Sequence, residues 1–195
     1  SKARKGGLEM VRALSSVRII GGRWRGRKLP ILNEAGLRPT PDRVRETLFN
    51  WLMPTIRGAV VLDVCAGTGV LGFEALSRGA SKVLFIESNT KLCGAMREMR
   101  GVLEADAEVI QQNVTNLSLA LTDQKFDLVF LDPPYQSDLY SEVIAQLIEG
   151  NHFAKNALMY IETSTKAAVN FAPESWQKVR SKTTGDVRYE LFQIV

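Results

Sequence analysis

Residues 59–72 read Ala-Val-Val-Leu-Asp-Val-Cys-Ala-Gly-Thr-Gly-Val-Leu-Gly, and this stretch decides the fold class. Its first six residues form an apolar run typical of a strand that is buried on both faces of a parallel sheet. The glycines that follow have the spacing GxGxxG, which permits a tight turn and a close approach of the backbone to a ligand. The apolar residues after the loop predict a helix over about 70–78. A strand, a glycine loop and a helix in this order indicate an open, doubly wound α/β sheet.

The same alternation of strands and helices continues toward the C-terminus. The patterns predict strands at 82–87, near 108–110, at 126–131 and at 157–162, and helices over about 89–104, 114–121 and 138–149. Segments 176–183 and 187–194 are strand-like and are separated by Gly185-Asp186, a two-residue hairpin signal. We therefore expect a Rossmann-like α/β sheet with a C-terminal antiparallel hairpin, and a ligand at the carboxyl ends of its strands.

The N-terminal part of the chain follows a different pattern. Residues 1–16 lack periodicity and are expected to be a disordered or tag-derived tail. Residues 17–20 predict a short strand that Gly21-Gly22 turns back, and residues 24–29 predict its return strand or an arm. A loop is expected from Pro30 to Leu37.

A helix is predicted from Thr40, whose hydroxyl can cap its N-terminus, with Pro41 at its first position. Three parts result: the tail 1–16, a basic hairpin and helix at 17–58, and the main α/β domain at 59–195.

Charge is distributed unevenly along the chain. The net charge of +4 combines +9 in residues 1–58, which hold 13 Lys and Arg against four Asp and Glu, with about −5 in the remainder. A basic segment on an acidic body suggests that the partner is a phosphate-bearing polymer. The residues expected to contact this polymer are Arg23, Trp24, Arg25, Arg27, Lys28 and Arg38.

Composition argues against several classes of protein. Hydrophobic residues make up 45% of the chain, yet no apolar stretch approaches the ~20 residues needed to span a bilayer, and no secretory leader is recognisable. We therefore expect a cytoplasmic protein without a membrane partner. With two cysteines and one histidine, no metal site is expected.

The glycine loop alone leaves two cofactors open. Glu87 ends the second predicted strand and can accept hydrogen bonds from ribose hydroxyls, which both NAD and S-adenosylmethionine carry. Asp63 lies where a carboxylate would meet the ammonium group of S-adenosylmethionine, although it could instead bond only the loop amides.

Asp132-Pro133-Pro134-Tyr135 favours S-adenosylmethionine. An amino nitrogen on an aromatic ring is a poor nucleophile because its lone pair is delocalised. The Asp132 carboxylate and the Pro133 carbonyl could accept its two N–H groups and free the lone pair. Tyr135 offers a ring on which a flipped-out base could stack. The motif predicts methyl transfer to an amino group, and leaves the base and the polymer open.

The chain resembles the RsmD-type 16S ribosomal RNA guanine-N2 methyltransferases over residues 17–194. The most specific part is the N-terminal block, Arg18-Ile-Ile-Gly-Gly-Arg-Trp-Arg-Gly-Arg-Lys-Leu-Pro30, followed by Leu37-Arg-Pro-Thr40 and by Asp42-Arg-Val-Arg-Glu-Thr-Leu-Phe-Asn-Trp-Leu52. Generic S-adenosylmethionine enzymes lack this block.

The resemblance implies a seven-stranded class I methyltransferase fold with an N-terminal hairpin that contacts RNA. It implies transfer of a methyl group from S-adenosylmethionine to N2 of one guanine in 16S ribosomal RNA, in an assembled or assembling small subunit, by an enzyme that we expect to be a monomer. The residues expected to contact the cofactor are Thr40, Asp63, Ala66, Gly67, Thr68, Gly69, Glu87, Ser88, Asn113, Val114 and Asp132. Asp132, Pro133, Pro134 and Tyr135 match the catalytic loop.

Other functions remain to be compared with this one. Tyr135 stands where many members have Phe, and its hydroxyl resembles adenine-N6 enzymes, so adenine is the alternative base. A DNA amino-methyltransferase, an NAD-dependent oxidoreductase and a non-enzymatic ribosome-assembly factor are the alternative classes.

Overall fold

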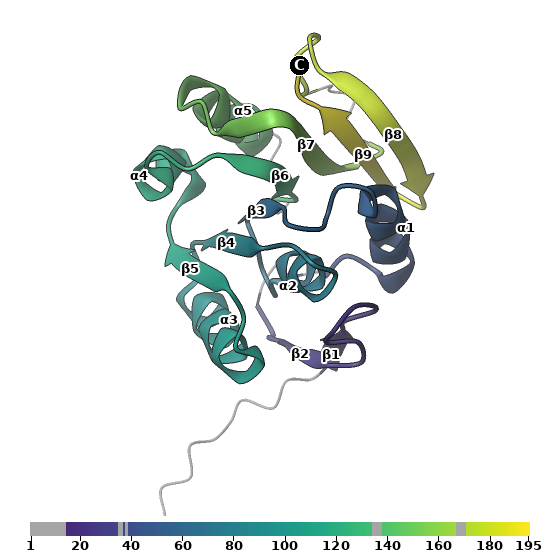
Figure 1. Ribbon diagram of the computed structural model, residues 1–195, viewed down its shortest axis with the longest axis vertical. Coiled ribbons are helices and arrows are strands. Elements are labelled where there is room, and N and C mark those ends of the chain that lie inside the picture. Colours follow the sequence, from purple (N-terminus) through teal and green to yellow (C-terminus); the bar gives the residue numbers. More distant parts are fainter. Residues whose placement is uncertain (1–14, 35–36, 38, 134–137, 167–170) are drawn as a thin grey trace, which may run out of the picture.

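The computed structural model describes residues 15–34, 37, 39–133, 138–166 and 171–195. Figure 1 shows one twisted sheet with helices on both faces and a small hairpin beside it. The seven strands of the sheet are β3 (Val60–Val64), β4 (Lys82–Glu87), β5 (Ala107–Gln111), β6 (Phe126–Leu131), β7 (Phe153–Ser164), β8 (Gln177–Thr184) and β9 (Val187–Gln193). Their order is β5-β4-β3-β6-β7-β9-β8.

This topology confirms the doubly wound sheet, and the seven strands agree with the methyltransferase resemblance. The chain enters the sheet at the interior strand β3, moves outward to β5, and returns to β6 on the other side of β3. Strands β3 to β7 are parallel, whereas β7, β9 and β8 pair antiparallel. The order reverses between β3 and β6, which is where open α/β sheets bind ligands.

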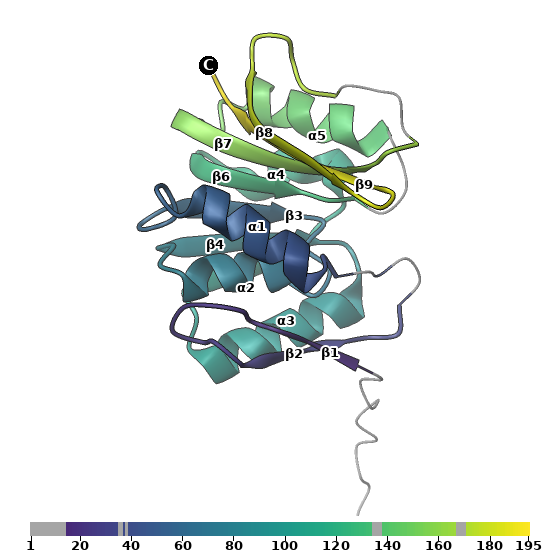
Figure 2. The ribbon, with the colours of Figure 1, turned by 90° about the vertical axis from the view of Figure 1, so that its right-hand side faces the viewer.

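The helices divide between the two faces of the sheet. They are α1 (Asp42–Leu52), α2 (Val70–Ser77), α3 (Thr90–Leu103), the 3-10 turn η1 (Val114–Asn116), α4 (Leu117–Leu121) and α5 (Asp138–Glu149). Figure 2 shows α1, α2 and the N-terminal hairpin on the face turned to the viewer, with α5 behind the sheet. None of the helices in the described ranges is both long and apolar enough to cross a membrane.

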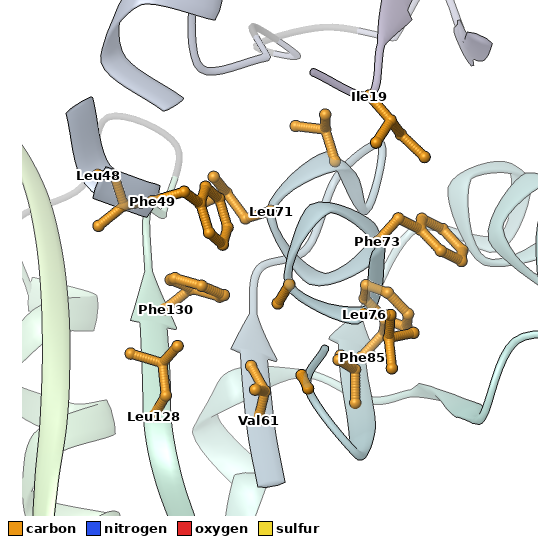
Figure 3. Close-up of a cluster of buried hydrophobic side chains, with 14 of the residues drawn as sticks. Ile19, Leu48, Phe49, Val61, Leu71, Phe73, Leu76, Phe85, Leu128 and Phe130 are labelled. Atoms are coloured by element: carbon orange, nitrogen blue, oxygen red, sulfur yellow. The ribbon is translucent and has the colours of Figure 1, made fainter. Parts of the chain in front are cut away.

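Two hydrophobic clusters, one on each face, hold these layers together. In the first, Phe49 of α1 meets Phe130 of β6 edge to face, with ring centroids 6.0 Å apart. Figure 3 shows both rings beside Leu71 of α2, and Ile19 reaching the same cluster from the hairpin region. The N-terminal residues therefore share a core with the main sheet.

The N-terminal hairpin differs in position from the sequence prediction. Its strands are β1 (Ser15–Arg18) and β2 (Lys28–Ile31), rather than 17–20 and 24–29. The first strand ends early because the amides of Ile20 and Gly21 donate to the Glu74 carboxylate of α2, at 2.8 and 3.2 Å. The second strand begins late because Trp24 to Arg27 form a turn, closed by the Arg27 amide on the Trp24 carbonyl at 2.9 Å.

Two further boundaries of this region were predicted wrongly. Ser15 and Ser16 belong to β1, so the expected disordered tail does not extend to residue 16. Pro30, expected in a loop, lies in β2, where a two-stranded ribbon tolerates a residue without an amide donor.

Thr40 does not cap α1. The N-cap is Pro41, no side chain caps the helix, and the first helical residue is Asp42. The Thr40 hydroxyl donates instead to the Glu162 carboxylate of β7, at 3.2 Å. Of the other elements, β4, β6 and α5 have the predicted bounds, and β7 is longer than the predicted 157–162.

Candidate active site

The described residues predicted to bind a cofactor come together at one edge of the sheet, apart from Thr40, which reaches that edge through Glu162. They lie at the carboxyl ends of β3, β4, β5 and β6, four neighbouring strands. Pro134, Tyr135 and Arg38 lie outside the described residues, so their predicted roles stay predictions.

The glycine loop between β3 and α2 forms a tight turn. Gly67 and Gly69 have φ of +59° and +78°, a region that L side chains rarely adopt. The Gly69 amide donates to the Ala66 carbonyl at 2.8 Å, and the Thr68 hydroxyl accepts from the Val70 amide at 3.2 Å. A Cβ at Gly67 would lie 3.0 Å from Leu37 Cδ1, so Leu37 packs closely over the loop and a side chain at this position would crowd it.

Asp63 is buried, with 3% of its surface exposed, and its Oδ2 accepts from the Gly72 amide of α2 at 3.1 Å. Burial raises the pKa of this carboxyl well above its usual value and the Glu87 charge adds to the effect, whereas the bond from Gly72 opposes it. The structure thus shows an amide contact for Asp63, and a cofactor contact stays a prediction.

Glu87 and its neighbours continue the site along β4 and β5. The Glu87 carboxylate accepts from the Gly67 amide at 3.0 Å and from the Asn89 amide at 2.8 Å. A carboxylate has about four acceptor positions, so two remain for ribose hydroxyls. Ser88 is exposed beside it. Beyond β5, Asn113 caps η1 through the Thr115 amide at 3.0 Å, and Val114 is buried.

Strand register places four acidic side chains on the same face of the sheet. Asp63 pairs with Phe85 of β4 and Phe130 of β6, and Phe130 pairs with Tyr160 of β7. Side chains alternate between faces along a strand, so residues two positions further on point to that same face. These residues are Glu87, Asp132 and Glu162, at or just beyond the strand ends.

Asp132 presents an available carboxylate at this edge. The residue is half-buried, and within the described ranges no group donates a hydrogen bond to its oxygens. Burial raises its pKa well above the usual value, and the charges of Glu162 and Asp63 raise it further. Pro133 follows it and is buried. A group of this kind can accept an N–H and then its proton at a pH nearer neutrality than an ordinary aspartate.

Glu162 is a site residue that the sequence analysis missed. Its Oε2 accepts from the Tyr160 hydroxyl at 2.6 Å and from the Thr40 hydroxyl at 3.2 Å, and its carbonyl accepts from the Tyr140 hydroxyl at 2.6 Å. Burial raises the pKa of Glu162, while the two hydroxyl donors oppose that shift. The available signal was its place at the end of a predicted parallel strand, the position that also identified Asp63, Glu87 and Asp132.

Cys65 lies among these carboxylates but does not supply a thiolate. Burial, and after it the charges of Glu87, Asp132 and Asp63, raise its pKa to about 12. The thiol therefore stays protonated at neutral pH. Within the described residues, no three His, Cys, Asp or Glu side chains gather in a way that could hold a metal ion.

The segment after β2 covers the cofactor side of this edge. Glu34 accepts from the Asn89 side-chain amide at 3.1 Å and lies 3.6 Å from the Lys91 ammonium group. With Leu37 over the glycine loop and Thr40 on Glu162, this segment joins the N-terminal region to the site.

The basic residues of the hairpin lie at a distance from this edge. Arg23, Arg25, Arg27 and Lys28 are exposed, and none forms an ion pair with any residue that the structure describes. Trp24 is 9% exposed, and the Arg23 guanidinium lies 4.2 Å from its ring centroid. The indole therefore packs within the turn and stabilises it. The turn is bonded to Ser77 at the C-terminal end of α2, about 12 Å of helix away from the glycine loop.

Comparison with known proteins identifies the family. Residues 17–193 match the family described as Conserved hypothetical protein 95. A Haemophilus influenzae protein named Ribosomal RNA small subunit methyltransferase D is 48% identical over 185 residues, which cover 93% of this chain and 95% of that protein. The chain belongs to the RsmD family.

Other members and structural relatives agree with this assignment. The RsmD protein of Escherichia coli K12 is 43% identical over 178 residues, which cover 91% of this chain and 89% of that protein. The solved structure of the putative methyltransferase yhhF from Escherichia coli has a TM-score of 0.85 at 39% identity, covering 92% of this chain and 98% of that one. The RsmD fold is therefore the fold described above.

The raised pKa of Asp132 predicts a stabilising substitution. The folded protein holds this proton more tightly than the unfolded chain, so the free energy of unfolding falls as the pH rises from the ordinary carboxyl pKa through the raised one. At pH 8 the buried charge is a net destabilising group. Asp132→Asn is expected to raise the free energy of unfolding by on the order of 1 kcal/mol at pH 8, with the gain vanishing toward pH 4.

Urea unfolding at both pH values measures this effect. Asp123→Asn is the matched control, because Asp123 is exposed and should change stability at neither pH. A destabilised Asp132→Asn variant at pH 8, or a gain that persists at pH 4, contradicts the prediction.

Proposed function

We propose that this protein transfers a methyl group from S-adenosylmethionine to the N2 amino group of a guanine in 16S ribosomal RNA. The observation that carries the proposal is the Asp132 carboxylate, to which no group in the described ranges donates a hydrogen bond and which lies one strand away from the glycine loop. The names of the Haemophilus influenzae and Escherichia coli relatives support small-subunit ribosomal RNA as the polymer.

The residues at the strand ends fit the proposed cofactor. The positive φ angles of Gly67 and Gly69 turn the loop tightly, and the absence of side chains lets its backbone approach a ligand closely. Residues 66–69 would hold the methionyl part, Glu87 and Ser88 the ribose, and Asn113 and Val114 the adenine. When bound, the cofactor supplies a methyl group on a positively charged sulfur.

Asp132 would act on the amino group that receives the methyl. Its carboxylate accepts one N–H and the Pro133 carbonyl accepts the other, which directs the nitrogen lone pair away from the aromatic ring. After transfer, the nitrogen loses one proton to the Asp132 carboxylate, which releases it to solvent. We infer the same stacking role for Tyr135 as the sequence suggested, with the base turned out of any helix.

The distance between the basic turn and the site favours a large substrate. An RNA that contacts both Arg25 and Asp132 must extend along the length of α2, on the order of 10–15 Å. Such a span favours a folded RNA or an assembling small subunit over a single nucleotide.

The identity of the product tests the proposed function. The protein is incubated with labelled S-adenosylmethionine and small subunits from cells that lack the modification, and the labelled nucleoside is then identified by mass. N2-methylguanosine in 16S ribosomal RNA is the expected product. Label in N6-methyladenosine, in DNA offered in parallel, or in no nucleic acid contradicts the proposal.

Neutralising the turn is expected to weaken RNA binding in a salt-dependent manner. Each phosphate contact adds to the slope of log affinity against log salt, by about 0.7–0.9. The triple variant Arg23→Ala, Arg25→Ala, Arg27→Ala should therefore reduce that slope by about 2 if each arginine meets one phosphate. Filter binding to small subunits at salt concentrations between about 50 and 200 mM measures this slope.

Two controls accompany the triple variant. The double variant Arg25→Ala, Arg27→Ala leaves the Arg23–Trp24 contact intact and should retain most of the effect. Neutralising the exposed Lys125, Lys155 and Lys182 removes equal charge elsewhere. If the two triple variants change the slope equally, the phosphate contacts do not lie on the turn.

A further inference from the structure

We propose that Glu162 recognises the ring N1–H of the guanine whose amino group faces Asp132, and thereby selects guanine over bases with an acceptor at that position. The inference rests on the function proposed above and assigns a base-recognition residue to it. Four observations carry it: the place of Glu162 in the sheet, the orientation of its carboxylate, its proximity to Asp132, and the donor pattern of guanine.

Glu162 lies on the substrate side of Asp132. Leu131 of β6 pairs with Ile161 of β7, so Asp132 and Glu162 are the next residues on neighbouring strands, which lie about 4.8 Å apart. The glycine loop and Glu87 are on the other side of Asp132, after β3 and β4. A base between Asp132 and Glu162 therefore does not occupy the space of a cofactor held by the glycine loop.

The Glu162 carboxylate is held in one orientation and keeps one oxygen available. Both hydroxyl donors, Tyr160 at 2.6 Å and Thr40 at 3.2 Å, bond the same atom, Oε2. The Tyr140 hydroxyl fixes the backbone through the Glu162 carbonyl at 2.6 Å. In the part of the chain that the structure describes, no group donates to Oε1. Oε1 of Glu162 is therefore available to accept a hydrogen bond from a ligand.

The pair of carboxylates matches the hydrogen-bonding edge of guanine. Guanine presents its N1–H directly beside its N2 amino group, so an acceptor for each can be placed side by side. Adenine and 2-aminopurine carry an unprotonated ring nitrogen, N1, beside their amino groups. This nitrogen would face the Glu162 carboxylate as one acceptor opposite another. A buried acceptor left opposite another acceptor is strongly disfavoured. The N1–H would also be the third donor to Glu162 and would favour its charged form.

The test compares two bases at one position. Small subunits are reconstituted with 16S RNA in which the methylated guanosine, located by the mass experiment, is either retained or replaced by 2-aminopurine. Both bases carry an amino group at C2, but only guanosine carries N1–H. Single-turnover rate constants for methyl transfer and binding affinities are measured for wild type and Glu162→Gln.

Wild type should favour guanosine over 2-aminopurine by roughly 10- to 100-fold in rate constant. Glu162→Gln should lower this ratio at least about tenfold, because the amide can donate to the N1 acceptor of 2-aminopurine. Dividing the guanosine-to-2-aminopurine ratio of wild type by that of Glu162→Gln cancels the difference in intrinsic reactivity between the two bases. Binding of S-adenosylhomocysteine, measured by calorimetry, should be unchanged in the variant.

Two further variants make the result specific to this position. Glu149→Gln makes the same chemical change at an exposed residue at the end of α5 and should keep the wild-type ratio. Tyr160→Phe removes one donor from Oε2 and should lower the ratio by a few-fold. If Glu162→Gln does not fold, the ratio of Tyr160→Phe decides, and an unchanged ratio overturns the inference.

The outcomes separate this inference from the proposed function. If N2-methylguanosine forms and Glu162→Gln keeps the wild-type ratio, the inference is wrong and the proposed function stands. If wild type methylates another base or none, the proposed function fails. A lower ratio in Glu162→Gln with cofactor binding intact supports the assignment of Glu162 to base recognition.

Discussion

Asp132→Ala is expected to lower the rate constant for methyl transfer by at least about 10²-fold, while S-adenosylhomocysteine binding changes little. The carboxylate accepts no hydrogen bond from any described residue, so it is available to the amino group in the proposed function. Without it, the amino group loses the acceptor that draws its lone pair out of the ring and the group that takes its proton. Single-turnover methyl transfer to small subunits measures the loss of rate, and calorimetry measures the affinity for S-adenosylhomocysteine.

The control for this prediction is Asp123→Ala, because Asp123 is exposed and belongs to no site. It should retain wild-type transfer. If Asp132→Ala stays within about tenfold of wild type, which corresponds to ~1.4 kcal/mol, Asp132 does not have the proposed role. A parallel loss of cofactor binding would place Asp132 in the cofactor site rather than opposite the base.

Arg45→Ala is expected to lower the free energy of unfolding by about 3–5 kcal/mol. The Arg45 and Glu74 side chains are both 0% exposed and lie 3.3 Å apart. Arg45 also donates to the Arg18 and Thr40 carbonyls at 2.8 and 3.0 Å and pairs with Asp42. Its loss leaves the Glu74 charge with a weaker countercharge and removes the bonds that join the hairpin, α1 and α2. Thermal and urea unfolding measure the change.

Arg43→Ala is the matched control, since Arg43 is exposed on the same helix and should change stability by less than about 0.5 kcal/mol. Arg45→Lys keeps a positive charge opposite Glu74 and should recover part of the loss, because the buried Glu74 carboxylate then keeps its countercharge. If Arg45→Ala behaves like Arg43→Ala, the buried pair does not hold the N-terminal region in place.

The same contacts connect the hairpin with the edge of the sheet that carries the candidate active site. Glu74 bonds the amide of Ile20, Arg45 bonds both Glu74 and the Thr40 carbonyl, and the Thr40 hydroxyl bonds Glu162. The basic turn, the covering segment and the proposed base-recognition residue are thus positioned through one continuous set of polar contacts. This arrangement explains how an N-terminal extension can belong to the site without contributing a strand to the main sheet.

Much of the site could be predicted because it follows the order of the strands. Asp63, Glu87 and Asp132 each come at or directly after an apolar run, and the carboxyl ends of parallel strands meet at one edge. Glu162 obeys the same rule, but nothing local distinguishes it from any glutamate at the end of a strand. Its importance depends on hydroxyls at positions 40 and 160, and Thr40 is 122 residues away in sequence.

Local patterns in the sequence determined the βα units, the glycine loop, the C-terminal hairpin and the place of Asp132, because hydrophobic period and turn residues act over only a few positions. Only the tertiary structure showed where β1 ends, that Thr40 bonds Glu162 instead of capping α1, and which residues pair with Arg45. Glu74 ends β1 by binding the Ile20 amide from 54 positions away, and it meets Arg45 across 29. Buried polar groups must find partners wherever the packed chain places them, and that choice cannot be read from neighbouring residues.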